Sequence, residues 1–291
     1  MLTNKQKKQM NNNFILRTVT GILFVIILVG GIIGGEIPFG ILFLIITLLS
    51  VREFCNLVNQ YEKDIHINTP LCTIAGGVLF LTFYYYQQVM SWAILPFYLC
   101  FLIAIMVIEL YAKKTNPAGN WAFSFMSQFY VALPFALLNI IAWMFPDSSG
   151  IPAYSFILPL SLFIFTWVND TGAYCVGVTF GKHRLFERIS PKKSWEGSFG
   201  GAIFCVIAAI ILSHFYPILN RWEWIGFALV IVVFGTWGDL CESLMKRHWG
   251  IKDSGNILPG HGGMLDRFDS TLLAVPAVLV YLLMVLMVRG L

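Results

Sequence analysis

Apolar runs long enough to cross a membrane recur along the whole chain, and they constrain its fold more than any other feature. A helix must carry roughly 20 apolar residues to span the hydrocarbon core of a bilayer. Only 12% of the 291 residues are charged, whereas a soluble domain usually carries about a quarter. A soluble all-helical protein could not solvate its surface at this level. The pattern therefore indicates an integral membrane protein.

We expect an all-α, polytopic bundle of about nine transmembrane helices. The expected spans are 15–34, 37–51, 69–87, 92–112, 123–145, 154–180, 197–216, 223–245 and 270–289. A short turn at Gly35 and Glu36 joins the first two, and the second is short enough to be tilted or only partly spanning. Neither a repeat nor a low-complexity linker divides the sequence. Residues 1–291 are expected to form one membrane domain, with N-terminal helices in 1–150 and a motif-bearing half in 151–291.

The basic residues lie mainly on one side of these spans. Of the 19 Lys and Arg residues, only Arg221 and Arg289 fall on the other side. Because loops rich in Lys and Arg stay in the cytoplasm, the N-terminus is predicted inside and the C-terminus outside. The net charge of +4 is too small to indicate a nucleic-acid partner.

The helix expected before the last loop carries polar residues on one face. Asp239, Glu242, Ser243, Lys246 and Arg247 are spaced i, i+3, i+4, i+7 and i+8. A carboxylate inside an apolar run, such as Asp239, costs several kcal/mol unless it is paired or bound to metal, so it marks a functional site. The alternative is an ion pair with Lys246 or Arg247 that only fixes helix packing.

Two further aspartates, Asp266 and Asp269, begin the last helix. Their i, i+3 spacing makes them face the same way, although one of them could instead be a helix cap. Magnesium prefers a few carboxylate oxygens together with water and substrate phosphate, and no cysteine cluster favours zinc. Asp239, Asp266 and Asp269 are therefore the predicted Mg²⁺ ligands.

The loop before the last helix is rich in glycine and charge. Gly262 and Gly263 allow close approach of a ligand and let backbone N–H groups point at an anion. A tight turn that merely reverses the chain is the alternative. The other candidate residues in and beside this loop are Lys252, Asp253, Arg267 and His261, which either orients the loop or transfers a proton.

A second polar stretch interrupts the expected sixth helix. Asn169 precedes Asp170, which is again a carboxylate inside the membrane. The following loop ends in Lys192, Lys193, Ser194 and Glu196. The lysines are either positive-inside residues or triphosphate contacts, and Ser194 could cap the next helix. The residues expected to bind substrate are Asn169, Asp170, Lys192, Lys193, Ser194, Glu196, Ser243, Gly262 and Gly263.

The sequence places carboxylates, cationic side chains and glycine-rich backbone at one membrane interface. This combination is suited to binding a metal ion and a polyphosphate. Phosphoryl-type transfer needs little beyond positioning, a metal ion and cations on the leaving group. A transporter or channel is the alternative class. It predicts polar residues along a path to both faces, whereas here they cluster on one side.

The segment Ser243–Asp269 resembles the signature of the phosphatidate cytidylyltransferases, membrane enzymes that make CDP-diacylglycerol. The matching residues are Ser243, Lys246, Arg247, Lys252, Asp253, Gly255, Pro259, His261, Gly262, Gly263, Asp266, Arg267 and Asp269. The stretches Asn169–Tyr174 and Ser190–Gly197 also look like the family's. The resemblance covers the motif-bearing half, and the first 150 residues match only in being hydrophobic.

The resemblance implies transfer of CMP from CTP to phosphatidic acid, with pyrophosphate released. It implies Mg²⁺, with a monovalent cation such as K⁺ as a candidate second ion. Asp239, Asp266 and Asp269 would hold the metal. Lys192, Lys193, Lys246, Arg247, Lys252 and Arg267 would hold phosphates.

The family further implies a multi-pass protein of the cell inner membrane, with its active site facing the cytoplasm. Because the tails of phosphatidic acid stay in lipid while CTP comes from the cytosol, we also expect a cavity open sideways to lipid. A homodimer is expected. A nucleotidyltransferase for another lipid or polyprenyl phosphate and a binding protein that has lost turnover are the nearer alternatives.

Overall fold

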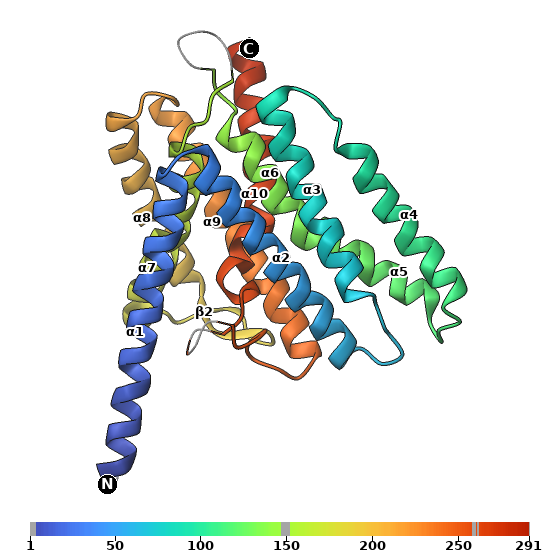
Figure 1. The fold of residues 1–291 in the computed structure, drawn as a ribbon. Helices are drawn as coiled ribbons and strands as arrows, with labels where there is room; N and C mark the ends of the chain where they lie inside the picture. The colour runs from blue at the N-terminus through green and yellow to red at the C-terminus, as the bar shows by residue number, and fades with distance from the viewer. Residues whose placement is uncertain (1–3, 147–151, 258–259, 261, 291) are drawn as a thin grey trace.

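The protein is almost entirely helical in the computed structural model, which describes residues 4–146, 152–257, 260 and 262–290 (Figure 1). The α-helices are α1 (Asn4–Ile33), α2 (Glu36–Tyr61), α3 (Thr69–Val89), α4 (Leu95–Tyr111), α5 (Pro117–Met126), α6 (Leu133–Ala142), α7 (Ile157–Phe180), α8 (Trp195–Phe215), α9 (Arg221–His248) and α10 (Leu265–Arg289). A π-helical segment, η1 (Ser127–Ala132), joins α5 to α6, so these three form one continuous rod.

Counting that rod once, the described residues form nine helical rods, which agrees with the expected polytopic bundle. Six of them are long and apolar enough to cross a membrane: α2, α3, the α5–α6 rod, α8, α9 and α10. Residues Arg17–Ile33 of α1 and helix α4 are shorter apolar stretches.

Helix α2 is longer than expected. It has 26 residues and ends at Tyr61, so the expectation of a short span over 37–51 is wrong. Arg52 and Glu53 end the apolar run, but both are good helix formers, and the helix continues through them. Glu53 is buried at 6% exposure, so this extension brings a carboxylate into the interior.

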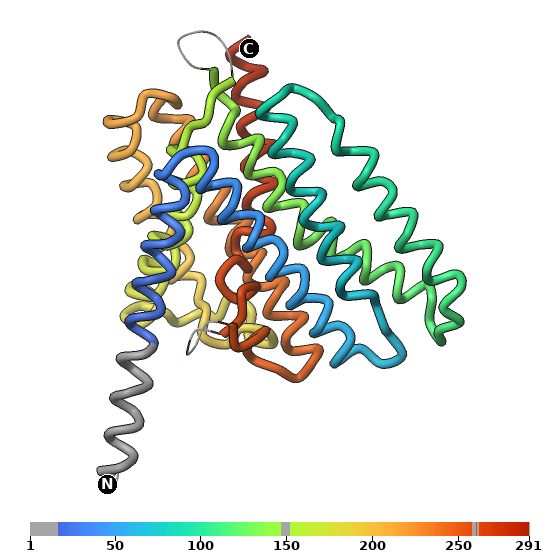
Figure 2. The backbone as a smooth tube through the Cα atoms, viewed as in Figure 1, coloured from blue at the N-terminus to red at the C-terminus, as the bar shows by residue number. Residues whose placement is uncertain are grey.

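The rods alternate in direction (Figures 1 and 2). The β1–β2 hairpin and the α9–α10 loop lie at one end of the bundle, which we call the site end. The end of α10 lies at the opposite end. The loops that carry most of the basic charge are thereby gathered together.

The hairpin was not expected from the sequence. Strands β1 (Arg184–Phe186) and β2 (Ser190–Ser194) pair antiparallel between α7 and α8. Lys192 and Lys193 therefore lie on a strand and not in an irregular loop. Ser194 ends β2 and caps α8, since its hydroxyl accepts the Gly197 N–H at 3.2 Å, which confirms the capping alternative.

Aromatic packing fixes α10 against both halves of the chain. The ring of Phe268 lies 5.9 Å from Phe24 of α1, 5.3 Å from Phe135 of α6 and 6.0 Å from Phe163 of α7, between ring centroids. Phe268 is fully buried and stands between Asp266 and Asp269 in sequence. The same core that joins the helices therefore sets the position of both aspartates.

Helices α7 and α8 pack closely through small residues, as membrane helices commonly do. A side chain at Gly200 would collide with Val176 of α7. We predict that Gly200→Leu forces the two helices apart and destabilises the protein by about 1–3 kcal/mol. Thermal unfolding in detergent measures this. Gly30→Leu is the matched control, because no atom lies within 4 Å of a side chain placed there; equal melting temperatures for the two variants would contradict the packing.

Candidate active site

Four aspartates from three helices line one cavity of about 300 Å³. Asp170 comes from α7, Asp239 from α9, and Asp266 and Asp269 from the first turns of α10. We call this the aspartate cavity. Its other lining residues are Thr20, Gly21, Phe24, Val25, Thr166, Trp167, Arg267 and Ser270. The i, i+3 spacing does place Asp266 and Asp269 on one side of α10, as expected.

Asp239 is held from two sides. It forms an ion pair with Lys193 of β2, and its carboxylate accepts the Ser243 hydroxyl at 3.1 Å. The alternative prediction, in which Asp239 forms an ion pair with Lys246 or Arg247 that only fixes helix packing, is wrong. Lys246 is bound elsewhere, and Arg247 donates to the Ile251 carbonyl at 3.0 Å.

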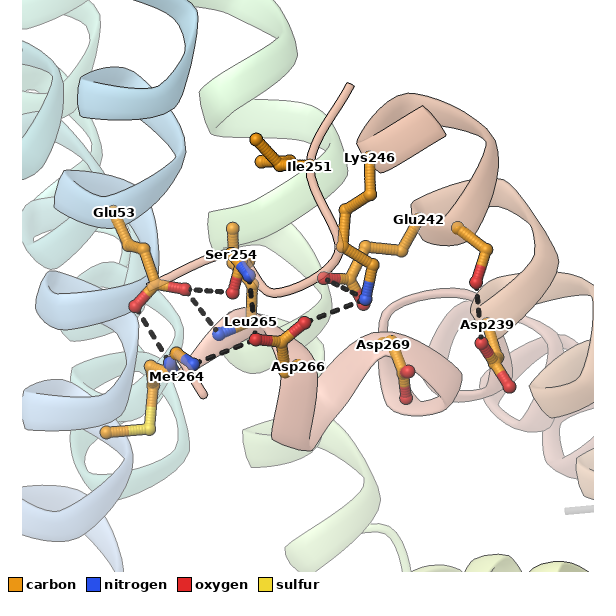
Figure 3. A network of polar contacts seen from close by, with 12 residues as sticks. Glu53, Asp239, Glu242, Lys246, Ile251, Ser254, Met264, Leu265, Asp266 and Asp269 are labelled. Atoms are coloured by element: carbon orange, nitrogen blue, oxygen red, sulfur yellow. Dashed lines mark hydrogen bonds and ion pairs between the residues drawn. The ribbon is translucent and has the colours of Figure 1, made fainter. Parts of the chain in front are cut away.

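Asp266 binds both α9 and the loop that precedes α10 (Figure 3). One oxygen accepts the Lys246 ammonium at 2.7 Å, and the other accepts the backbone N–H groups of Ser254 and Gly263, each at 2.8 Å. Its side chain is 7% exposed. Asp266 therefore does not cap α10, because its partners belong to the loop and to α9.

The glycines of this loop position a backbone N–H donor for the Asp266 carboxylate. Gly262 has a φ of 84°, a conformation that favours glycine, and it turns the Gly263 N–H toward the carboxylate. The backbone was expected to hold an anion. In this structure that anion is the protein's own Asp266.

Lys246 lies between two carboxylates. Besides Asp266 it faces Glu242 at 3.4 Å on its own helix, and both side chains are buried. Asp269 accepts the N–H of Ser270 at 2.6 Å. Among the described residues neither Asp269 nor Asp170 has an ion-pair partner. Two of the four aspartates of the cavity are therefore paired with lysines and two are not.

A second cavity, of about 210 Å³, adjoins the first. Asp170 lines both. We call the second one the lysine cavity; it is lined by Asn169, Asp170, Ala173, Tyr174, Lys192, Lys193, Ser194, Gly197, Ser198 and Thr236. The fold thus brings the polar stretch of α7 together with the lysines of β2, although they are more than twenty residues apart in sequence.

Other predicted residues take different positions. Glu196 accepts the backbone N–H groups of Lys182 and His183, at 3.1 and 3.2 Å, and lies 2.6 Å from the His183 ring. It fixes the start of the hairpin and lines neither cavity.

The exposed residues Arg247, Lys252 and Asp253 likewise line neither cavity. Arg267 does line the aspartate cavity. His261 lies outside the described residues.

Sequence reasoning missed Glu53 of α2. Its carboxylate accepts the Ser254 hydroxyl at 2.5 Å and the N–H groups of Met264 and Leu265 at 2.8 and 3.1 Å. Figure 3 shows the resulting network running from Glu53 through Ser254 and Asp266 to Lys246. Glu53 therefore fastens the α9–α10 loop and the start of α10 to the N-terminal half.

One signal could have revealed Glu53. A glutamate directly after an apolar run is a buried-charge candidate if the helix continues beyond it. Ending the span at residue 51 placed Glu53 in solvent instead.

Comparison with known proteins extends the resemblance to nearly the whole chain. Residues 15–285 match a family model described as the cytidylyltransferase family. The chain belongs to the cytidylyltransferase family. It is 34% identical over 262 residues to the phosphatidate cytidylyltransferase of Staphylococcus aureus strain COL, covering 90% of this chain and 96% of that protein.

Two further members, both also named phosphatidate cytidylyltransferase, give the same coverage. They come from Staphylococcus epidermidis strain ATCC 12228, at 33% identity, and Staphylococcus haemolyticus strain JCSC1435, at 34%. Family likeness therefore includes the first 150 residues, which had been expected to match only in hydrophobicity. This agrees with the contact that Glu53 makes from that half to the α9–α10 loop.

We predict that Glu53→Leu destabilises the protein by on the order of 2–3 kcal/mol, because buried donors lose their acceptor. Hydrogen exchange at the Met264 and Leu265 amides should accelerate. Glu187→Leu, at an exposed position of the hairpin turn, is the matched control and should leave both amides protected. Unchanged exchange in Glu53→Leu would show that the loop is held by other contacts.

Proposed function

We propose that this chain is a membrane-embedded phosphatidate cytidylyltransferase that transfers CMP from CTP to phosphatidic acid, forming CDP-diacylglycerol and pyrophosphate. One observation carries the proposal: an acidic cavity and a lysine-lined cavity meet at Asp170 in a chain that aligns over 90% of its length with proteins of that name. The same coverage favours phosphatidic acid over another lipid or polyprenyl phosphate.

The reaction joins a phosphate oxygen of phosphatidic acid to the α-phosphorus of CTP and breaks the bond to the β-phosphate. The attacking phosphate is already ionised near neutral pH, so positioning and charge compensation matter more than proton removal. Lys193 lines the lysine cavity and forms an ion pair with Asp239, which lines the aspartate cavity. Its side chain is 29% exposed, so it can exchange the carboxylate for a phosphate oxygen.

The residues present suit a hard divalent cation. Four carboxylates surround one cavity, and two of them have no ion-pair partner among the described residues, so their repulsion favours a bound cation. Within the described part of the chain, no three such ligands stand together in metal-binding geometry; Lys193 and Lys246 engage Asp239 and Asp266. Mg²⁺, when bound, would neutralise charge on the phosphates. Asp239, Asp266 and Asp269 are its proposed ligands, and K⁺ as a second ion stays a prediction.

The site end is proposed to face the cytoplasm. CTP is a cytosolic nucleotide, and the site end gathers the loops that carry most of the Lys and Arg residues. Phosphatidic acid would keep its tails in the bilayer and present its headgroup at the same depth. A homodimer also remains a prediction.

We predict that the protein purified in detergent forms CDP-diacylglycerol and pyrophosphate from CTP, phosphatidic acid and Mg²⁺. Chelation by EDTA should abolish turnover, and added Mg²⁺ should restore it. Mg²⁺ alone should also raise the melting temperature, since a ligand that binds only the folded state stabilises it. Absence of any lipid-linked CMP would overturn the proposal. Turnover that persists in EDTA would contradict only the proposed metal requirement.

Two neighbouring aspartates should separate catalysis from stability. Asp269→Asn should lower kcat by on the order of 10²-fold or more, with little change in melting temperature, because Asp269 makes only a local backbone bond. It should also lose the thermal shift given by Mg²⁺. Asp266→Asn should cost about 3 kcal/mol of stability as well, because it removes the negative charge that pairs with Lys246 and binds the loop N–H groups. Equal melting temperatures for the two variants would contradict this division.

A further inference from the structure

A third cavity, apolar and of about 600 Å³, opens between α8, α9 and the hairpin. We call it the α8–α9 groove. Its lining residues are Leu185, Phe186, Trp195, Ser198, Phe199, Ala202, Leu229, Val232, Val233, Thr236, Trp237 and Leu240. Several of the aromatic residues at its rim are exposed, including Trp195 at 51% and Phe199 at 65%. In a chain that spans a membrane, such a groove faces the lipid.

The groove is built by one stripe from each helix. On α8 the lining residues Trp195, Ser198, Phe199 and Ala202 are spaced i, i+3, i+4 and i+7, which places them on one face. On α9 the stripe runs from Leu229 through Thr236 to Leu240. From Leu229 to Thr236 the helix rises about 10 Å, so the groove extends lengthwise along the bundle.

The groove also leads directly to the polar site. Ser198 and Thr236 line both the groove and the lysine cavity, and Asp170 lines both the lysine cavity and the aspartate cavity. Along α9, Leu229 and Val233 line the groove alone, Thr236 lines the groove and the lysine cavity, and Asp239 lines the aspartate cavity, while Trp237 and Leu240 continue the apolar wall of the groove. The three cavities are thus connected in the order apolar groove, hydroxyl-bearing junction at Ser198 and Thr236, and charged cavities.

We infer that one acyl chain of the phosphatidic acid substrate lies in the α8–α9 groove, with its ester region beside Ser198 and Thr236 and its phosphate at Lys193. The inference rests on the proposed function and adds the lipid's position. Charge and polarity match this occupant: the groove is apolar, the lysines compensate an anionic phosphate, and the junction carries two hydroxyl groups, of which that of Ser198 donates to the Ser194 carbonyl at 3.2 Å. A bulk bilayer lipid or a second copy of the chain would use only the apolar part.

The groove contributes by orienting the lipid tail, because burying the tail there gains no hydrophobic free energy relative to the bilayer. A lipid tail that moves from the bilayer into the groove exchanges one apolar environment for another. What the groove supplies is a fixed direction for the tail, which holds the headgroup phosphate toward the aspartate cavity. Blocking the groove should therefore penalise substrates whose tails must enter it and should spare those whose tails end near Ser198 and Thr236.

Ala202→Trp tests this by filling the groove one helical turn beyond Ser198. We expect kcat/KM for dioleoyl phosphatidic acid to fall by about tenfold or more, and that for dihexanoyl phosphatidic acid to stay within about twofold. Val233→Trp fills the groove from α9 and should have the same effect. This second variant keeps the test valid if Ala202→Trp fails to fold. Ile203→Trp is the matched control, because Ile203 is 60% exposed on α8 and does not line the groove.

An equal fall for both substrates, or no fall in either variant, would overturn the inference. A changed oligomeric state in Ala202→Trp, measured by light scattering, would also overturn it in favour of a subunit contact. Failure of the proposed function is distinguishable, because the unmodified protein would then make no CDP-lipid from either substrate. As a readout independent of turnover, phosphatidic acid with a photoreactive tail should label residues of α8 and α9, and labelling confined to other helices would contradict the groove.

Discussion

The carboxylate of Asp266 is the contact on which the architecture of the site depends. It accepts a lysine from α9 and two backbone N–H groups from the loop before α10, all within 2.8 Å. A buried carboxylate without partners would be strongly destabilising, and a buried pair that loses one member is costly for the same reason. Helix α9, the loop and α10 are therefore held in one arrangement, and Asp239 and Asp269 take their positions from it.

Glu53 gives this arrangement a second anchor in the N-terminal half. It binds the same loop from the opposite side through Ser254, Met264 and Leu265. Phe268 adds apolar contacts to α1, α6 and α7. The first half of the chain is thus more than a membrane anchor, because it determines where the start of α10 lies.

The fold class and the principal carboxylates were predictable from the sequence, for physical reasons. Membrane spans are long and apolar, and α10 shows its aspartates at a spacing that only a helix brings to one face. The partners of those aspartates were not predictable. Lys193 reaches Asp239 because a short hairpin folds back over the bundle, and no local pattern records that contact.

Helix α2 shows a further limit. Hydropathy ends a span at the first charges, whereas Arg52 and Glu53 remain helical because a distant loop satisfies the glutamate. A buried charged residue can be predicted to be functional only when the end of its helix is known. That boundary depends on tertiary contacts that lie more than two hundred residues away in sequence.

The pair between Lys193 and Asp239 has a consequence for how firmly the site can retain anything it binds. A ligand that recruits either side chain must first separate them, so its net affinity is lower than the sum of its own contacts. When the ligand leaves, the lysine and the carboxylate satisfy each other again, and no charge is left uncompensated. Under the proposed function, a site that closes on itself in this way favours the departure of a polyanionic product, which would otherwise be held by the cations that bind the nucleotide.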